Sequence, residues 1–332
     1  MTSSKFILTT LYLTLILVGL FICDICFGSV NLFSINSSSP LFSTILFDIR
    51  LPKALTCLIA GSGLALCGLL MQSLFRNPLA GPYVLGVSSG ASLFVAIATM
   101  LLSSIHISEF FLFGKSVITL FSITGAFGVT FIILLVSKKS RSNVTILLVG
   151  LMLAQILGAL QGLIEFLSSA DSLKTFIIWG MGSVGNTTLS DLLFIFPIFL
   201  AMICCAFYLI KPLNAILLNE QYAQNLGVNT NRLRLQVIII TAVLVGVITA
   251  FCGPIAFVGI SVPIASRLFF KSAHHLHQIT FCLLLGASTL LFADVMCQLV
   301  SSQFMLPINT VTTLIGSPVV IYLLFKSKLS IG

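Results

Sequence analysis

The sequence predicts an all-α membrane protein with about ten transmembrane helices in a single transmembrane domain, residues 1–332. Hydrophobic residues make up 58% of the chain, charged residues only 7%, and the mean hydropathy is +1.19. A soluble domain carries roughly 25% charged residues, so a soluble fold could not bury this much apolar surface. The apolar runs are continuous rather than alternating, which argues against a transmembrane barrel.

Ten apolar windows approach or exceed the length of about 20 residues that a helix needs to cross a bilayer. We interpret the first as a retained span, because it follows Lys5, is longer than the apolar part of a usual signal peptide and lacks a clear cleavage site. The predicted spans are 6–28, 50–75, 86–104, 116–136, 144–168, 189–210, 236–252, 255–270, 279–300 and 307–325.

The second span is rich in small residues. Gly61 and Ala65 are four residues apart, as are Gly63 and Cys67, so each pair shares a helix face. Such spacing lets helix backbones approach closely. We therefore expect this span in the middle of the bundle rather than against lipid.

The second and third spans are joined by the run RNPLAGPYVLG, Arg76–Gly86, which holds a charge, an amide, two prolines and two glycines. Irregular backbone close to hydrocarbon is tolerated only where protein or a water-filled path covers it. This run is therefore either a buried structural hairpin or part of a route through the membrane. The seventh and eighth spans are separated only by the turn Cys252–Pro254.

Two further segments lie between spans. Residues 171–187 are expected to form a partial or re-entrant helix beside the fifth span. Residues 211–236 are too polar to span and can form two short helices broken near Gly227. This stretch is either a docking surface for a soluble partner or an ordinary loop.

The basic residues indicate the orientation. If both termini face the cytoplasm, four of the 16 basic residues lie outside and the other 12 inside, as the positive-inside rule requires. The four outer residues are Arg50, Lys53, Lys115 and Lys174. The net charge of +8 thus needs no nucleic-acid partner.

Several tempting patterns are rejected as sites. Gly114-Lys115-Ser116 lacks the glycine that a phosphate-binding loop needs five residues earlier, where Glu109 stands. The nine cysteines are interpreted as small apolar packing residues. Three histidines are expected in a solvated cytoplasmic loop, since no cysteine or carboxylate accompanies them as a metal ligand. They are His274, His275 and His277.

Three acidic residues, Glu165, Asp191 and Asp294, fall near the outer ends of spans. They are too close to the outer interface to form a relay across the bilayer, so we expect a structural or docking role. No catalytic residue, metal site or cofactor is predicted.

Motifs spread over most of the chain, from about Phe47 to the C-terminus, resemble the FecCD-type permeases of bacterial ABC importers for iron-siderophores, haem and cobalamin. In order they are IRLPKAL (Ile49–Leu55), MQSLFRNPLAGPYVLGVSSGA (Met71–Ala91), NEQYAQNLGV (Asn219–Val228), CGPIAFVGISVPIASR (Cys252–Arg267), LLGASTLLFADV (Leu284–Val295) and LPINTVTTLIGSP (Leu306–Pro318).

The resemblance implies a cobalamin-importer-permease-like bundle of ten helices in the bacterial cytoplasmic (inner) membrane. It also implies a second permease subunit, identical or a paralogue, around a central path. Two cytoplasmic ATPase subunits would bind below and a substrate-binding protein outside. The chain itself would perform no catalysis, and ATP hydrolysis in the partners would drive alternating access.

The resemblance also assigns residues. The gate of the path would include Asn77, Pro78 and Leu79, with Ser142 and Asn143 as its second element. The segment that couples to the ATPase subunits matches the pattern G-E-x-x-A-x-x-L-G, with Asn219 in place of the first glycine. Its matching residues are Glu220, Ala223, Leu226 and Gly227. An exposed glutamate at such a helix end can sit in a groove of an ATPase subunit.

At the outer end, Arg50 and Lys53 are three residues apart and so share a helix face. By resemblance they would meet carboxylates of the binding protein, and rim charges of this kind mainly guide encounter and register. Gln298 occupies a position where the family can carry another arginine, so we expect fewer charged docking contacts.

Two other functions stay open as alternatives. An importer of free metal ions would favour His and Asp ligands along the path. An ion-coupled secondary transporter would place ionisable residues near mid-membrane on broken helices, and none is clearly placed there in the sequence.

Overall fold

The computed structural model describes residues 3–28, 40–101, 110–139, 143–300 and 306–326. In these ranges every regular element is a helix. Seven helices are long and apolar enough to cross a membrane, and three shorter apolar helices accompany them. The predicted fold class is thereby confirmed.

Each of the ten predicted spans corresponds to one apolar helix. They are α1 (Ser3–Cys26), α3 (Leu51–Phe75), α4 (Val87–Ala96), α5 (Phe110–Lys139), α6 (Asn143–Leu167), α8 (Leu189–Tyr208), α11 (Thr230–Cys252), α12 (Val258–Phe270), α13 (His275–Val300) and α14 (Ile308–Lys326). A short helix α2 (Pro40–Ser43) and the π-helical turns η2 (Thr44–Arg50) lead into α3, and the π-helical turns η3 (Ile97–Leu101) extend α4. The remaining helices are α7 (Ala170–Gly180), α9 (Ile210–Leu218) and α10 (Glu220–Asn225).

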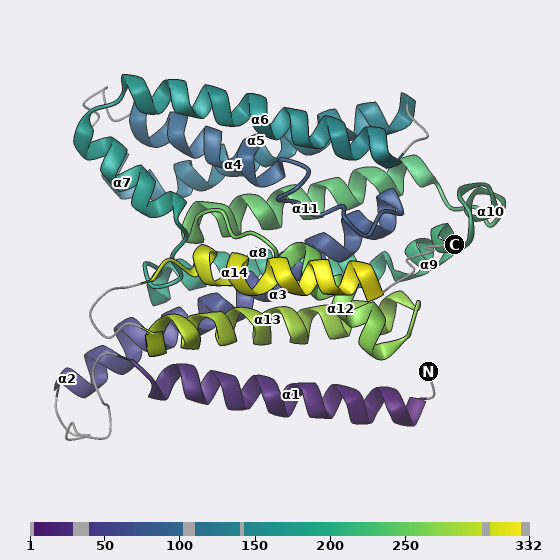
Figure 1. Ribbon diagram of the computed structural model, residues 1–332, viewed down its shortest axis with the longest axis horizontal. Helices are drawn as coiled ribbons and strands as arrows, with labels where there is room; N and C mark the ends of the chain where they lie inside the picture. Colours follow the sequence, from purple (N-terminus) through teal and green to yellow (C-terminus); the bar gives the residue numbers. More distant parts are fainter. Residues whose placement is uncertain (1–2, 29–39, 102–109, 140–142, 301–305, 327–332) are drawn as a thin grey trace.

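The long helices lie side by side along one axis (Figure 1). Helices α2 and α7 lie at one end of this bundle, whereas α9 and α10 lie at the opposite end, where α1 begins and α14 finishes. We call the end with α10 the inner end and the end with α7 the outer end. This arrangement separates the segments that the basic residues predicted to lie outside from those predicted to lie inside.

Helix α3 occupies the middle of the bundle, as its small residues predicted. All of its residues from Ile59 to Phe75 are buried. A Cβ atom added at Gly61 would lie 2.2 Å from the Gly286 carbonyl oxygen in α13, and one at Gly68 would lie 1.6 Å from the Gly259 oxygen in α12. The backbones of α3, α12 and α13 therefore touch where glycine removes the side chain.

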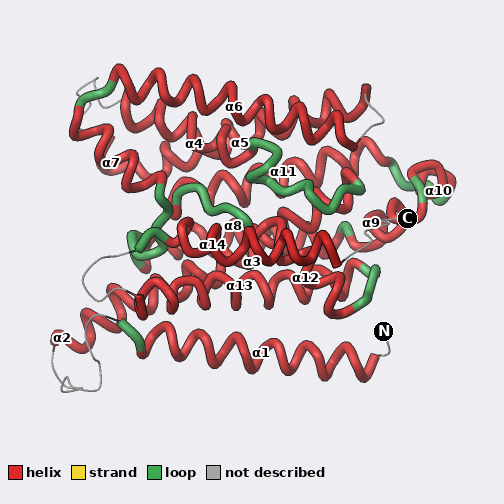
Figure 2. Tube along the Cα trace, viewed as in Figure 1, coloured by secondary structure: helices red, strands yellow, loops and turns green. Residues whose placement is uncertain are grey.

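Two irregular segments interrupt the bundle, and Figure 2 shows them as loop within it. The first is Arg76–Gly86 before α4 and the second is residues 253–257 before α12. Both contain a Gly-Pro pair, at Gly81–Pro82 and Gly253–Pro254, and both precede a short apolar helix. Long α3 and long α11 precede them and run in opposite directions (Figure 1).

Protein covers the backbone of both segments, as the bilayer requires. In the first, Val87 N–H donates to the Pro82 carbonyl at 2.9 Å, and Gly81 packs against Ile260 of α12. In the second, Ala256 N–H donates to Asn309 Oδ1 of α14 at 3.0 Å. In its later half Ala80 to Pro82 and Leu85 to Gly86 are buried and Tyr83 is exposed, whereas Asn77 to Leu79 are partly exposed.

Candidate coupling and gate region

Helix α10 forms a short projection at the inner end of the bundle (Figure 1). Asn219 starts it: its backbone is extended (φ −166°, ψ 150°) and its side chain accepts from Gln221 N–H at 3.2 Å. Asparagine is a favoured N-cap residue. The replacement of glycine at this position therefore gives the helix a defined beginning.

A glycine in the left-handed region ends α10. Gly227 has φ +82°, and nothing lies within 4 Å of the point that a Cβ atom would occupy there. Its N–H donates to the Gln224 carbonyl at 2.9 Å. Ala223 is fully buried against the bundle, whereas Tyr222 and Leu226 are 48% and 60% exposed. The projection thus shows apolar side chains to the solvent at the inner end.

The boundaries of this region differ from those predicted. The two short helices α9 and α10 are broken at Asn219, and Gly227 instead separates α10 from α11. Residues from Thr230 onward already belong to α11, because Asn229 caps that helix by accepting from Arg232 N–H at 3.0 Å. The polar composition of 230–236 reflects an exposed helix end rather than a loop.

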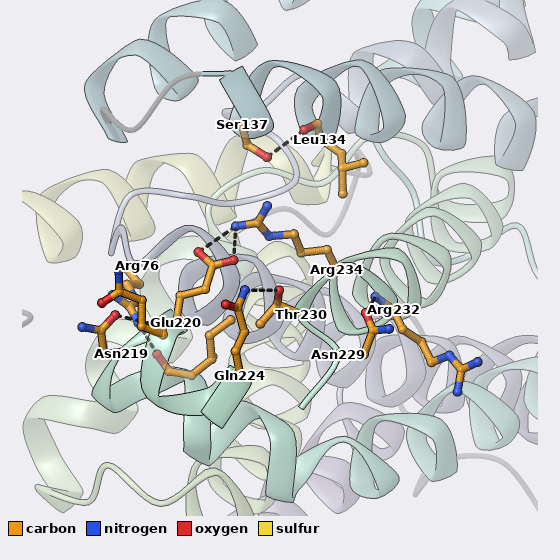
Figure 3. Close-up of polar contacts among 12 residues, drawn as sticks. Arg76, Leu134, Ser137, Asn219, Glu220, Gln224, Asn229, Thr230, Arg232 and Arg234 are labelled. Carbon is orange, nitrogen blue, oxygen red and sulfur yellow. Dashed lines mark hydrogen bonds and ion pairs between the residues drawn. The ribbon is translucent and has the colours of Figure 1, made fainter. Parts of the chain in front are cut away.

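Glu220 is bound within the chain rather than free. One guanidinium nitrogen of Arg234 lies 2.8 Å from Oε1 and 2.9 Å from Oε2 of Glu220 (Figure 3). The glutamate side chain is 38% exposed and the arginine side chain 18%. The pair joins the first turn of α10 to the second turn of α11, so these two elements are held together at their polar surface.

Helix α9 lies between this projection and the end of α3. Its Leu213 and Ile216 are buried in the core, and the Arg76 guanidinium donates to the Ile216 carbonyl oxygen. Arg76 itself has a positive φ of 48° and closes α3 by donating its N–H to the Gln72 carbonyl. The residue that ends α3 is therefore attached to α9.

The predicted gate residues follow directly. Asn77, Pro78 and Leu79 are all partly exposed, and Asn77 Oδ1 accepts from Leu79 N–H at 2.9 Å, which shapes a tight turn. Of the second predicted gate element, Ser142 lies outside the described residues. Asn143 is the first residue of α6, and its side chain is likewise outside the described part of the chain.

The prediction that the three histidines lie in a solvated loop is wrong for His277, which belongs to α13, and for His275. His275 is the first residue of α13 and only 1% exposed. Its Nδ1 lies 2.8 Å from Asn214 Oδ1 and its Nε2 lies 2.9 Å from Ser73 Oγ. Three helices therefore meet at this ring, a contact that a local sequence pattern cannot reveal.

The predicted docking residues lie in a polar cluster at the outer end. Lys53 Nζ is 2.6 Å from Asp294 Oδ2. Gln298 donates to the same Asp294 oxygen and to Asp24 Oδ1, each at 2.7 Å. The cluster thus links α1, α3 and α13.

Arg50 lies beside this cluster and is only 5% exposed. Its guanidinium donates to the carbonyl oxygens of Ile25 and Cys26, at 2.6 and 2.9 Å, at the end of α1. A cation at a helix C-terminus is electrostatically favourable. Arg50, the last residue of η2, therefore ties the end of α1 to the turns that lead into α3, whereas Lys53 remains partly exposed.

Sequence reasoning missed the residues that bind the predicted ones: Arg234, Asn214, Ser73 and Asp24. The sequence did contain a signal for Arg234, because this basic residue lies only 14 residues after Glu220, near the start of the next long helix. The other three had none, since their partners are distant in sequence. Among the described residues, no group of three or more His, Cys, Asp or Glu side chains could hold a metal ion.

Residues 11–326 match the FecCD transport family. The chain is 33% identical to the vitamin B12 import system permease of Klebsiella pneumoniae, over 95% of this chain and 93% of that protein. It is 31% identical to the hemin transport system permease of Yersinia pestis (86% and 84% covered). It is 33% identical to the molybdate import system permease of Haemophilus influenzae (87% and 83% covered).

A solved structure has the same architecture. It is an inward-facing conformation of a protein assigned to the metal-chelate type of ABC transporter. Its TM-score is 0.82 with 31% sequence identity, over 96% of this chain and 99% of that one.

Proposed function

Because the chain belongs to the FecCD transport family and is a permease subunit, we propose that it lines the transport path of an ABC importer. Two cytoplasmic ATPase subunits drive it, and an outer binding protein delivers the substrate. The chain works by alternating access in the cytoplasmic (inner) membrane, with both termini inside. We assign ATP hydrolysis to those partner subunits rather than to this chain.

The observation that carries this proposal is the α10 projection. Its exposed Tyr222 and Leu226 give a soluble partner an apolar contact, while the Glu220–Arg234 pair fixes the projection to α11. A partner that moves α10 therefore also moves a helix that runs the length of the bundle. Ala223 packs α10 against the bundle, and Gly227 ends the helix. Together with Glu220 and Leu226 they form the proposed coupling segment.

A second permease subunit fits on the α6 face. Helix α6 is largely exposed in the single chain, including the polar side chain of Gln155, and nothing lies within 4 Å of the Cβ positions of Gly158 and Gly162. Exposed amides are costly against lipid, and small residues suit close helix packing. The gate residues Asn77, Pro78 and Leu79, with Ser142 and Asn143, would close the path between the two subunits.

At the outer end, we assign docking of the binding protein to Lys53, Arg50 and Gln298. Lys53 is the partly exposed cation, and its carboxylate partner Asp294 is within the same chain. A carboxylate of the binding protein can form a second ion pair with Lys53 at the outer end of the bundle. Arg50 and Gln298 hold α1 and α13 in position around it.

For the substrate, we propose a metal chelate such as a ferric siderophore, haem or a corrinoid. The family and the vitamin B12 and hemin relatives support this class. The molybdate relative adds a small oxyanion to the candidates that an experiment must include.

The test is reconstitution of the chain with its genetically neighbouring ATPase and binding protein in proteoliposomes. We expect ATP-dependent depletion of one ligand from a panel of ferric siderophores, haem, cobalamin, molybdate and free Zn²⁺ or Mn²⁺. Uptake of the free ions alone would favour the metal-ion importer. Uphill uptake by the chain alone on an ion gradient would overturn the ABC assignment.

A further inference from the structure

The ring of His275 joins three helices at the inner end. An amide oxygen only accepts hydrogen bonds, so the contact with Asn214 Oδ1 of α9 places the His275 proton on Nδ1. Nε2 then accepts from the Ser73 hydroxyl in the last turn of α3. The backbone N–H of His275 donates to the same Asn214 oxygen at 2.8 Å. We call Asn214, His275 and Ser73 the inner hub.

A second contact ties α9 to the same part of α3. The Arg76 guanidinium donates to the Ile216 carbonyl, two residues along α9 from Asn214. Arg76 follows Ser73 by three residues and immediately precedes Asn77, where the proposed gate begins. The end of α3 is therefore attached to α9 directly through Arg76 and indirectly, through the His275 ring, at Ser73.

Helix α9 is also joined to α10 through the single residue Asn219. From this arrangement we infer that the inner hub is the positioning element that carries movement of α9 and α10 to the gate loop at Asn77. The inference rests on the proposed function, because it requires that ATPase subunits move α10.

Burial makes the hub suitable for this role. Ser73 is 3% and His275 1% exposed, so water cannot easily replace the hydrogen bond between them if it breaks. Asn214 is partly exposed and contacts the buried ring from the side of α9. An unpaired polar group on the buried ring of His275 or on Ser73 is costly, so the ring favours keeping both of its partners when α9 moves. Residues that contact neither the substrate nor the ATPase subunits can still modulate the coupling between the two sites.

The test uses the full complex in proteoliposomes and measures imported substrate and hydrolysed ATP in the same sample. Asn214→Ala removes the acceptor of both His275 donors, and we expect substrate imported per ATP to fall roughly fivefold or more. Binding of the ATPase subunits should not change. Asn214→Asp keeps an acceptor oxygen, and we expect it to retain most of the coupling.

The double variant Asn214→Ala/Ser73→Ala tests whether the residues act as one unit. If they do, its loss should equal that of Asn214→Ala alone, whereas independent sites would add their effects. Additive losses would overturn the inference.

Ser266→Ala is the matched control. Ser266 donates to Gln278 Oε1 at 2.8 Å, both residues are buried, and the bond joins α12 to α13 without α9. We expect reduced thermal stability but an unchanged transport ratio. An equal drop in the transport ratio for Ser266→Ala, or an unchanged ratio for Asn214→Ala, would overturn the inference. The proposed function would stand in that case, provided that the wild-type complex imports with ATP. A wild-type complex that fails to import with ATP would instead overturn the proposed function.

Discussion

Glu220 shows how the partner of a side chain changes the interpretation of a motif. The motif alone predicts that this glutamate reaches a groove of an ATPase subunit. In the structure both carboxylate oxygens bind Arg234. The carboxylate therefore holds α10 against α11, and we expect neighbouring exposed side chains such as Tyr222 and Leu226 to make the proposed contact with a partner.

Glu220→Arg should uncouple ATP hydrolysis from transport, because two like charges would then face each other between α10 and α11. The exchange Glu220→Arg/Arg234→Glu restores the attraction, so we expect it to recover most of the uptake. Uptake in proteoliposomes and correct membrane insertion are the measurements. If the exchanged pair stays as inactive as Glu220→Arg, the carboxylate contacts the ATPase directly and the bracing role is wrong.

The outer cluster contains a second ion pair that is more deeply buried. Asp294→Ala should lower the free energy of unfolding by about 3 kcal/mol, because it leaves Lys53 without its partner in a poorly solvated place. Thermal unfolding in detergent measures this loss. Asp171→Ala, which removes an exposed carboxylate, is the control. Equal thermal unfolding midpoints for Asp294→Ala and Asp171→Ala would show that the Lys53–Asp294 pair adds nothing to stability.

At the scale of elements, glycines decide which helices touch. Helix α3 meets α13 at Gly61 and Gly286 and meets α12 at Gly68 and Gly259. At both crossings backbone lies against backbone, with no side chain between the two helices. A side chain introduced at either crossing has to displace a backbone.

Gly68→Ala should be severely destabilising, since its Cβ would lie 1.6 Å from the Gly259 oxygen. Overpacking of this kind costs on the order of 1–3 kcal/mol or more. Gly128→Ala in α5 is the control, because nothing lies within 4 Å of its Cβ position. Yield of folded protein and the unfolding midpoint in detergent measure both, and a tolerated Gly68→Ala would contradict the close α3–α12 contact.

At the scale of the whole molecule, the irregular run at Arg76–Gly86 divides into two parts. In its later part Gly81 packs against Ile260 of α12 and Leu85 against Gly150 of α6, while Tyr83 between them is 42% exposed. Its first residues, from Asn77 to Leu79, stay partly exposed. Gly81 and Leu85 anchor the loop, and we expect two subunits to meet at its partly exposed first residues.

A cysteine at Asn77 tests this meeting point. We expect Asn77→Cys in two subunits to form a disulfide under mild oxidation in at least one nucleotide state, because a closed gate brings the two loops together. Gel mobility under non-reducing conditions measures the crosslink. Cys204 and Cys205, which are exposed, are replaced by serine in both the variant and the parent control. Absence of the crosslink in every nucleotide state would remove this loop from the gate.

The sequence by itself determined the fold class, the order of the ten apolar helices and the central place of α3. These properties are local: continuous apolar length, small residues four apart and the distribution of basic residues can each be read within one segment. The motif residues of the proposed coupling segment fall in α10 and directly after it, and the structure moved only the helix breaks, to Asn219 and Asn229.

The tertiary structure alone decided which polar groups meet. Ser73 and His275 are 202 residues apart, and Asp24 and Gln298 are 274 apart, yet each pair is within hydrogen-bond distance. Such partners depend on which helices pack together, and therefore on close glycine contacts such as Gly61–Gly286. A buried polar side chain must find its partner wherever packing has brought one, and no single segment of sequence contains that information.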